Sequence, residues 1–183
     1  MKIDRKCMFI FYLLLLLIQD KYIFYLPTIP IYPNNKDEIK IVQQYVRNRS
    51  QSDIDFHKKT DVSVAPAFAD YVDESISELR EMLNAFPLPY LILCFKYSIN
   101  RARPKQIDNE LNVLDSTSAN TPAYPAGHSF QAYYLEKILS QKYPQKADLF
   151  HEIAEKCNNV RIVAGLHYPS DGQFSKQLIH TLF

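Results

Sequence analysis

Glycine, cysteine and net charge are all scarce in this chain of 183 residues. It contains three glycines, three cysteines, 21 basic residues and 20 acidic ones. A formal net charge of +1 gives no general field that attracts nucleic acid or acidic surfaces, so any anion has to be bound by a local cluster of basic side chains. We therefore expect no nucleic-acid partner.

The three cysteines are Cys7, Cys94 and Cys157. They are odd in number and far apart, and no two of them have C-x-x-C spacing. This pattern argues against a disulfide framework and against a zinc site. We predict that all three side chains are buried and that the protein holds no metal.

The chain also lacks a hydrophobic run of membrane-spanning length. Residues 7–18 are apolar and follow a basic start, as in a secretory signal, but no small-residue cleavage site comes after them. A spanning helix needs about 20 apolar residues, more than this run supplies. Residues 1–26 therefore have three open interpretations, which are a signal peptide or anchor, an interfacial helix that contacts a membrane, and a core helix. The first two predict a membrane-associated or secreted protein, and the third a cytoplasmic one.

The rest of the chain is expected to form one helical domain. Proline-rich residues 27–34 predict an extended linker. Hydrophobic content of 47% and the chain length suit a single core. No segment alternates with period two, whereas helical spacing and capping signals recur, so we predict an all-α, single-domain helical bundle over residues 35–183. Helices are expected from Asn35, from Ser52, at 73–86, at 89–100, from Gly127 to Pro144, at 145–166 and from Pro169, with a long loop at 105–126.

The few glycines accompany basic and titratable residues in the C-terminal half. Gly127, Gly165 and Gly172 lie inside or directly beside two of three short fragments. Because glycine permits close backbone approach, we expect these segments to surround a ligand. The fragments are Lys96-x6-Arg103-Pro104, Pro125-Ala126-Gly127-His128 and Arg161-x5-His167-x3-Asp171.

Together, the cations in these fragments predict a phosphate site. A phosphoryl group in transfer spreads negative charge over three oxygens, and a protein stabilises it with fixed donors. Arg103 and Arg161 can each present a planar fork to two oxygens, and Lys96 adds a point charge. The backbone N–H of Gly127, at the start of an expected helix, is a further donor.

The two histidines in the fragments can divide the catalytic work. His167 is the better nucleophile candidate because Asp171, four residues later, can accept a hydrogen bond from its other ring nitrogen and fix the tautomer. His128 has no carboxylate close in sequence, and we expect it to be the general acid. Three further histidines lack such neighbours and are expected to be surface or packing residues: His57, His151 and His180.

The order of the fragments resembles the type 2 phosphatidic acid phosphatase superfamily, which includes bacterial non-specific acid phosphatases and vanadium-dependent haloperoxidases. The family pattern is Lys-x6-Arg-Pro, Pro-Ser-Gly-His and Ser-Arg-x5-His-x3-Asp, and the likeness covers residues 90–175. This resemblance implies a helical bundle and a metal-independent phosphomonoester hydrolase that forms a phosphohistidine on His167. It also implies the roles given above for the other site residues.

Two residues depart from the family pattern. Ala126 and Val160 stand where the family usually has serine, so one hydroxyl donor to the phosphate is missing. A hydrogen bond to a charged group contributes about 1.5–3 kcal/mol. We expect weaker binding of substrate or vanadate but retained activity, because no fixed charge, acid or nucleophile is lost.

The motifs leave other functions and the substrate open. The same cradle holds vanadate as a cofactor in the haloperoxidases, although those enzymes are usually much larger, and a third alternative is an inactive binding or membrane-tethered module. Under the phosphatase interpretation no cofactor is needed, and vanadate is an inhibitor. The leaving group is either a lipid or a small soluble group, and the sequence indicates no oligomeric state. Three tyrosines beside the motifs either line an apolar entrance or belong to the core: Tyr97, Tyr124 and Tyr168.

Overall fold

Helices make up the regular structure of residues 32–183, the part of the chain that the computed structural model describes. No strand occurs within these residues, so the all-α prediction is confirmed. Residues 32–183 also form one compact unit. The predictions for the hydrophobic segment 1–26 and for linker residues 27–31 lie outside the described residues.

The helices agree with the expected ones to within a few residues at most boundaries. Along the chain they are α2 (Asn35–Arg47), α3 (Gln51–Thr60), α4 (Ala65–Phe68), η1 (Ala69–Tyr71), α5 (Ile76–Asn84), α6 (Leu88–Ile99), α7 (Pro104–Ile107), α8 (Gly127–Lys142), η2 (Pro144–Lys146), α9 (Ala147–Val163) and α10 (Pro169–Leu182).

Capping side chains decide where the first helices begin. Asn34 caps α2, one residue before the predicted Asn35. Ser50, not Ser52, caps α3, because its hydroxyl and the Asp53 carboxylate form a reciprocal capping box. The same kind of box starts α5 three residues later than predicted. Neighbouring polar residues compete as caps, and only one of them satisfies the first-turn N–H groups.

The short helices were not predicted from the sequence. α4 and η1 lie between α3 and α5. α7 begins at Pro104, and its other three residues occupy the start of the region 105–126 that was expected to be a loop. Proline suits this position because a first-turn N–H has no partner within the helix. Residues 108–126 contain no regular element, so most of the predicted loop is present.

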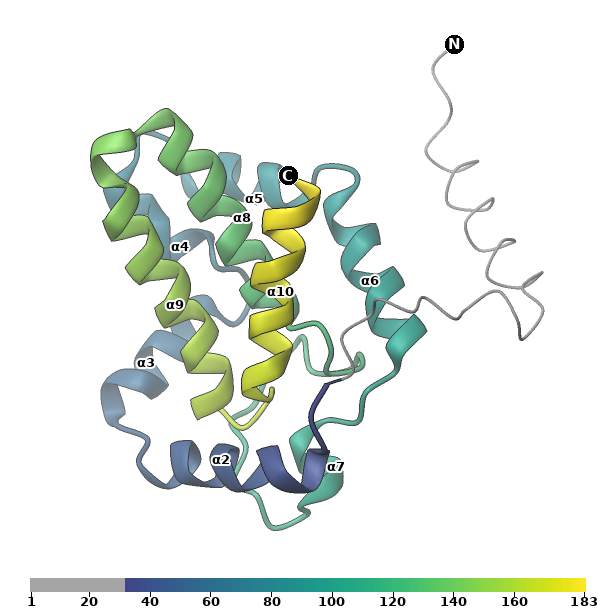
Figure 1. The fold of residues 1–183 in the computed structure, drawn as a ribbon. Coiled ribbons are helices and arrows are strands. Elements are labelled where there is room, and N and C mark those ends of the chain that lie inside the picture. The colour runs from purple at the N-terminus through teal and green to yellow at the C-terminus, as the bar shows by residue number, and fades with distance from the viewer. Residues whose placement is uncertain (1–31) are drawn as a thin grey trace, which may run out of the picture. The chain divides into compact units, whose positions relative to one another are not determined.

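The centre of the fold is made by α8, α9 and α10, which lie side by side (Figure 1). α8 and α9 are joined only by Tyr143 and η2, and α9 and α10 by a short turn, so each runs antiparallel to the one before it. The start of α8, the end of α9 and the start of α10 therefore meet at one end of the bundle. The Ala126 N–H donates to the Asp171 carbonyl there at 3.1 Å. This junction brings the second and third sequence fragments together.

A small second core closes that end of the bundle. α2 packs against both α9 and α7, as Figure 1 shows at the bottom of the view. Its side chains meet residues of the long loop, of α9 and of the turn before α10. The cluster consists of Ile39, Val42, Leu111, Ala123, Ile162 and Tyr168.

The apolar helix α6 is only partly covered by the bundle. Its single charged residue, Lys96, is buried, whereas Tyr97 is 60% exposed. Cys94 lies on the same helix and is half-buried, so the prediction that it is buried was wrong. Cys157 is buried, as predicted, and Cys7 lies outside the described residues.

Within residues 32–183, no helix is by itself both long enough and apolar enough to cross a bilayer. The segments Ile76–Asn84 and Leu88–Ile107 reach that length and apolar composition only as a pair, and the pair is bent by 53°.

Candidate functional site

Five of the seven residues predicted for the phosphate site line one pocket of about 310 Å³. They come from α6, from the segment before α7, from the start of α8 and from the turn before α10. The two others, Arg161 and Asp171, contact lining residues from behind the pocket wall. The five lining residues are Lys96, Arg103, Gly127, His128 and His167.

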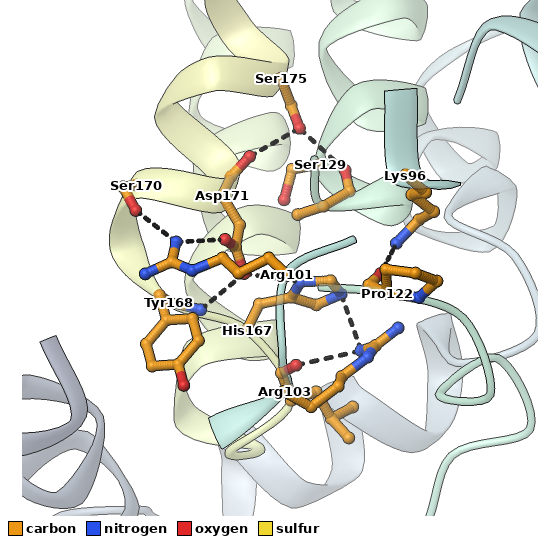
Figure 2. Close-up of polar contacts among 12 residues, drawn as sticks. Lys96, Arg101, Arg103, Pro122, Ser129, His167, Tyr168, Ser170, Asp171 and Ser175 are labelled. Carbon is orange, nitrogen blue, oxygen red and sulfur yellow. Dashed lines mark hydrogen bonds and ion pairs between the residues drawn. The ribbon is translucent and has the colours of Figure 1, made fainter. Parts of the chain in front are cut away.

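The imidazole of His167 has a partner at each ring nitrogen (Figure 2). Nδ1 lies 3.0 Å from Oδ2 of Asp171, and Nε2 lies 3.1 Å from Nη1 of Arg103. Because an ionised carboxylate only accepts and a guanidinium only donates, the ring carries its proton on Nδ1 and a lone pair on Nε2. Burial lowers the pKa of His167 well below its usual value. The ring is therefore neutral and in the tautomer that a nucleophile needs.

Asp171 is shared between His167 and Arg101, a residue that the sequence analysis did not identify. Its Oδ1 accepts a hydrogen bond from Arg101 Nη1 at 2.6 Å, and its Oδ2 accepts one from the Tyr168 N–H at 2.9 Å (Figure 2). Burial raises the pKa of Asp171 to about 6, and the Arg101 guanidinium acts against this rise. Arg101 therefore favours the ionised carboxylate beside the neutral imidazole.

Arg101 is almost completely buried and has a second carboxylate partner. Its Nη2 donates to Glu38 Oε2 at 2.7 Å. The guanidinium carbon also lies 4.0 Å from the ring centroid of Tyr168 and 4.3 Å from that of Tyr32, at cation–π distance. In the sequence, Arg101 is distinguished only by its position two residues before Arg103. The sequence did not reveal its role because its partners, Glu38 and Asp171, are distant in the chain.

Arg103 and Lys96 are held in the pocket by backbone carbonyls. Arg103 Nε donates to Thr121 O at 2.9 Å, its Nη1 to Leu166 O at 3.0 Å, and Lys96 Nζ to Pro122 O. Burial, followed by repulsion from a neighbouring arginine, lowers the pKa of Lys96 to about 7 and that of Arg103 to about 10. Within residues 32–183, neither cation forms a salt bridge with a carboxylate.

Asp61, the residue after α3, is a second residue that the sequence analysis missed. Its carboxylate accepts from Arg161 Nη1 at 2.9 Å, and its backbone carbonyl lies 2.8 Å from His128 Nε2. A carbonyl only accepts, so His128 carries its proton on Nε2 and keeps a lone pair on Nδ1. Burial lowers the pKa of His128 to about 3. This histidine is therefore neutral in the ligand-free pocket.

Arg161 is buried directly behind the pocket. Its Nη2 lies 3.0 Å from Ser116 Oγ and 3.1 Å from Ser118 Oγ, and Ser118 itself lines the pocket. Its Nε–H is buried and has no hydrogen-bond partner in the described part of the chain. A buried donor without a partner costs about 1–3 kcal/mol of stability, so this N–H is a candidate to donate a hydrogen bond to a ligand.

The other histidines are packing and surface residues, as predicted. His57 is buried, with Nδ1 3.4 Å from Arg161 Nη1, while His151 and His180 are exposed. Among the three tyrosines beside the motifs, Tyr124 and Tyr168 are in the core, and Tyr97 is exposed on α6. None of them lines the pocket of about 310 Å³.

Gly165 and Gly172 are required for backbone conformation and helix packing, and not for the close approach of a ligand that was predicted. Gly165 has φ of 77°, a left-handed conformation that other residues rarely adopt. At Gly172 a Cβ would lie 1.8 Å from Asn158 Oδ1, so packing of α10 on α9 excludes a side chain. A Cβ at Gly127 would make only ordinary contacts, the nearest at 3.5 Å. Only Gly127 lines the pocket.

A larger pocket, of about 690 Å³, shares Arg103 and Thr121 with the first one. Its remaining lining comes mainly from the long loop and from the chain around α7. Neither His128 nor His167 reaches it. The smaller pocket is therefore the candidate site, because both histidines and two cations converge there.

Comparison with known proteins gives no match for this chain, either among family models or among curated proteins. The described residues also contain no group of three or more histidine, cysteine or acidic side chains placed to hold a metal ion.

Proposed function

We propose that the protein is a phosphomonoester hydrolase of the type 2 phosphatidic acid phosphatase superfamily, with the acid phosphatase and vanadium haloperoxidase type of helical bundle. One observation carries the proposal. The neutral imidazole of His167, oriented by Asp171, presents its lone pair beside two buried cations that form no salt bridge with a carboxylate of residues 32–183. Buried charges are normally paired, so Lys96 and Arg103 form a site that an anion completes.

The donors around the pocket suit a phosphate group. Arg103 and Lys96 supply charge-assisted hydrogen bonds, and the first-turn N–H of Gly127 lies at the positive end of α8. The Nε–H of Arg161, behind the pocket wall, has no hydrogen-bond partner among residues 32–183 and is a further candidate donor. Together they match a group whose charge is spread over several oxygens.

In the proposed reaction, His167 Nε2 attacks phosphorus while the bond from phosphorus to the leaving oxygen breaks. Nδ1–H stays hydrogen-bonded to Asp171, which stabilises the positive charge that develops on the ring. Arg103 Nη1, which donates to Nε2 in the free pocket, transfers its hydrogen bond to a phosphate oxygen. Water then attacks the phosphohistidine, and inorganic phosphate leaves.

Proton transfer to the leaving group is assigned to His128. Its Nε2–H is held by the Asp61 carbonyl, so Nδ1 is the position that exchanges a proton. Because the pKa of His128 is about 3 in the free pocket, the proton arrives with the substrate. A phosphomonoester has a second pKa of about 6, so its monoanion can pass a proton to Nδ1. That proton goes on to the leaving oxygen. Nδ1 then accepts one from the attacking water and passes it to the phosphate product, so His128 is neutral again.

The test uses the purified full-length protein and an aryl phosphate. We expect hydrolysis without added metal and in the presence of chelator, and inhibition by vanadate. His167→Ala should prevent trapping of a phosphoenzyme after rapid quenching in alkaline denaturant. His128→Ala should retain aryl phosphate cleavage far better than alkyl phosphate cleavage, because an aryl leaving group hardly needs a proton.

Two results would contradict the proposal. Bromide oxidation by peroxide in the presence of vanadate, without phosphate release, would favour the haloperoxidase alternative. Tight phosphate binding without hydrolysis of any monoester would favour the inactive module.

A further inference from the structure

The N-cap position of α8, at the helix end that faces the pocket, carries no hydroxyl, and the Ser129 hydroxyl of the first turn already donates to Asn158. The N-cap residue is Ala126, and no side chain caps the helix. The long loop of residues 108–126 supplies a hydroxyl from elsewhere, because Ser118 lines the same pocket as His128 and His167. This serine lies outside all three sequence fragments.

We propose that Ser118 is a phosphate-binding residue whose hydroxyl donates a hydrogen bond to a ligand oxygen. The proposal rests on the proposed function, since it takes the ligand of the pocket to be a phosphate. It follows from counting donors and acceptors around the hydroxyl.

The Ser118 hydroxyl has one proton to donate and two lone pairs that accept. One lone pair accepts from Arg161 Nη2 at 3.1 Å, since a guanidinium only donates. The remaining contact of Ser118 Oγ within the described residues is with Ser116 Oγ, also at 3.1 Å. Whether the Ser118 proton is already used therefore depends on Ser116.

The Ser116 hydroxyl is already fully engaged. It donates its own proton to Asp61 Oδ1. It accepts from Arg161 Nη2 at 3.0 Å and from the Ser118 N–H at 3.3 Å, which occupies both lone pairs. A third donor is left without an acceptor, so the Ser118 proton is available to an oxygen in the pocket.

This arrangement also gives Arg161 a route to the ligand. The guanidinium polarises the Ser118 hydroxyl that it donates to, and a polarised hydroxyl is a stronger donor. Positive charge behind the wall is thereby extended into the pocket through one hydrogen bond. The hydroxyl compensates for the one that Ala126 lacks at the start of α8.

The experiment measures dissociation constants of inorganic phosphate and of orthovanadate for full-length variants. Ser118→Ala should weaken binding about tenfold to a hundredfold, as expected for loss of a hydrogen bond to a charged group. Ser118→Thr keeps the hydroxyl and should bind much more tightly than the alanine variant. Ser98→Ala makes the same chemical change at an exposed position of α6 outside the pocket and should leave binding unchanged.

The outcomes separate this proposal from the proposed function. Unchanged binding by Ser118→Ala, with phosphate bound normally by the unmodified protein, would overturn the role of Ser118 alone. Equal weakening in the alanine and threonine variants would overturn the hydroxyl as the contact. Failure of the unmodified protein to bind either anion would overturn the phosphate site itself. Thermal unfolding of each variant checks that the fold is kept. We expect it to be kept because Ser118 is only half-buried.

Discussion

At the scale of single residues, the ionisation of Asp171 controls the state of His167. An ionised carboxylate only accepts, and so it fixes the ring proton on Nδ1. A protonated carboxyl group can also donate, and it no longer fixes this tautomer. Burial raises the pKa of Asp171 to about 6, and the ion pair with Arg101 at 2.6 Å opposes it. We therefore expect Arg101 to be a positioning residue that acts through Asp171 on His167, the proposed nucleophile.

Replacing Arg101 with methionine should raise the pKa of Asp171 further. The proposed mechanism requires the ionised carboxylate, which is present above this pKa and lost as the pH falls through it. The acid limb of the profile of kcat against pH should therefore move to higher pH, so the loss of activity is larger near pH 6 than near pH 8. The measurement is a pH–rate profile with an aryl phosphate.

Arg101→Lys is the matched control because it keeps a cation beside Asp171. Its acid limb should lie closer to that of the unmodified protein than the limb of Arg101→Met. If Arg101→Met lowers kcat equally at every pH, then Arg101 serves only the fold and does not tune the carboxylate.

The sequence predicted residues whose partners are close along the chain or share a recurring spacing. Asp171 follows His167 by four residues, and the structure places the two side chains in contact. Arg101 and Asp61 were missed because their site partners are 70 and 100 residues away. A single sequence gives no signal for such pairs, and only the fold shows that they meet.

At the scale of helices, the antiparallel order of α8, α9 and α10 brings the fragments to one end of the bundle. Helical spacing and prolines in the sequence predicted these three helices well. A proline near a helix start marks one position as the start and disfavours the neighbouring ones. The starts of α3 and α5 were less accurate, since several polar residues there compete as caps. The short turns α4 and α7 are too brief to show periodicity.

Contact between α10 and α9 depends on Gly172, which gives a prediction for stability. In Gly172→Ala the new methyl would lie 1.8 Å from Asn158 Oδ1, which also accepts a hydrogen bond from Ser129 at 2.8 Å. Either Asn158 loses this bond or α10 moves off α9. We expect the free energy of unfolding to fall by about 1–3 kcal/mol, measured by urea unfolding. A shift of α10 would also lower kcat, because Asp171 is the adjacent residue.

Two further variants test the reason for this loss. Gln173→Ala changes an exposed residue of the same helix, and the free energy of unfolding should change by less than about 0.5 kcal/mol. In an Asn158→Ala background, Gly172→Ala should cost much less, because the obstructing amide is gone. Additive losses in the double variant would show that Gly172 is needed for another reason.

At the scale of the whole molecule, the proposed site lowers the free energy of unfolding of the protein. The free pocket gathers Lys96 and Arg103 in a buried place, and the burial that lowers the pKa values of both is a penalty on their charged forms. A composition close to neutral did not indicate this, because the net charge of +1 averages over the chain. Lys96 and Arg103 are far from His167 in the sequence, and only the tertiary fold brings them together.

Replacing Lys96 with methionine should therefore stabilise the ligand-free protein. The folded pKa of Lys96 is about 7, lowered from 10.5, so between these values the unfolded chain binds a proton that the folded one does not. Stability then rises with pH across this interval, and the full penalty is present below about pH 7. We expect Lys96→Met to raise the free energy of unfolding by about 1–4 kcal/mol near neutral pH and by less near pH 10, measured by urea unfolding.

The same variant should lose the stabilisation that a bound anion provides. For the unmodified protein, inorganic phosphate at about 100 times its dissociation constant should add about 2.7 kcal/mol to the free energy of unfolding. The same phosphate concentration should add much less to Lys96→Met, because one of the cations that bind it is missing. A ligand-free stability that falls in Lys96→Met at both pH values would mean that the hydrogen bond from Lys96 to the Pro122 carbonyl outweighs the cost of the buried charge. An equal response to phosphate in both proteins would mean that Lys96 does not contact the anion.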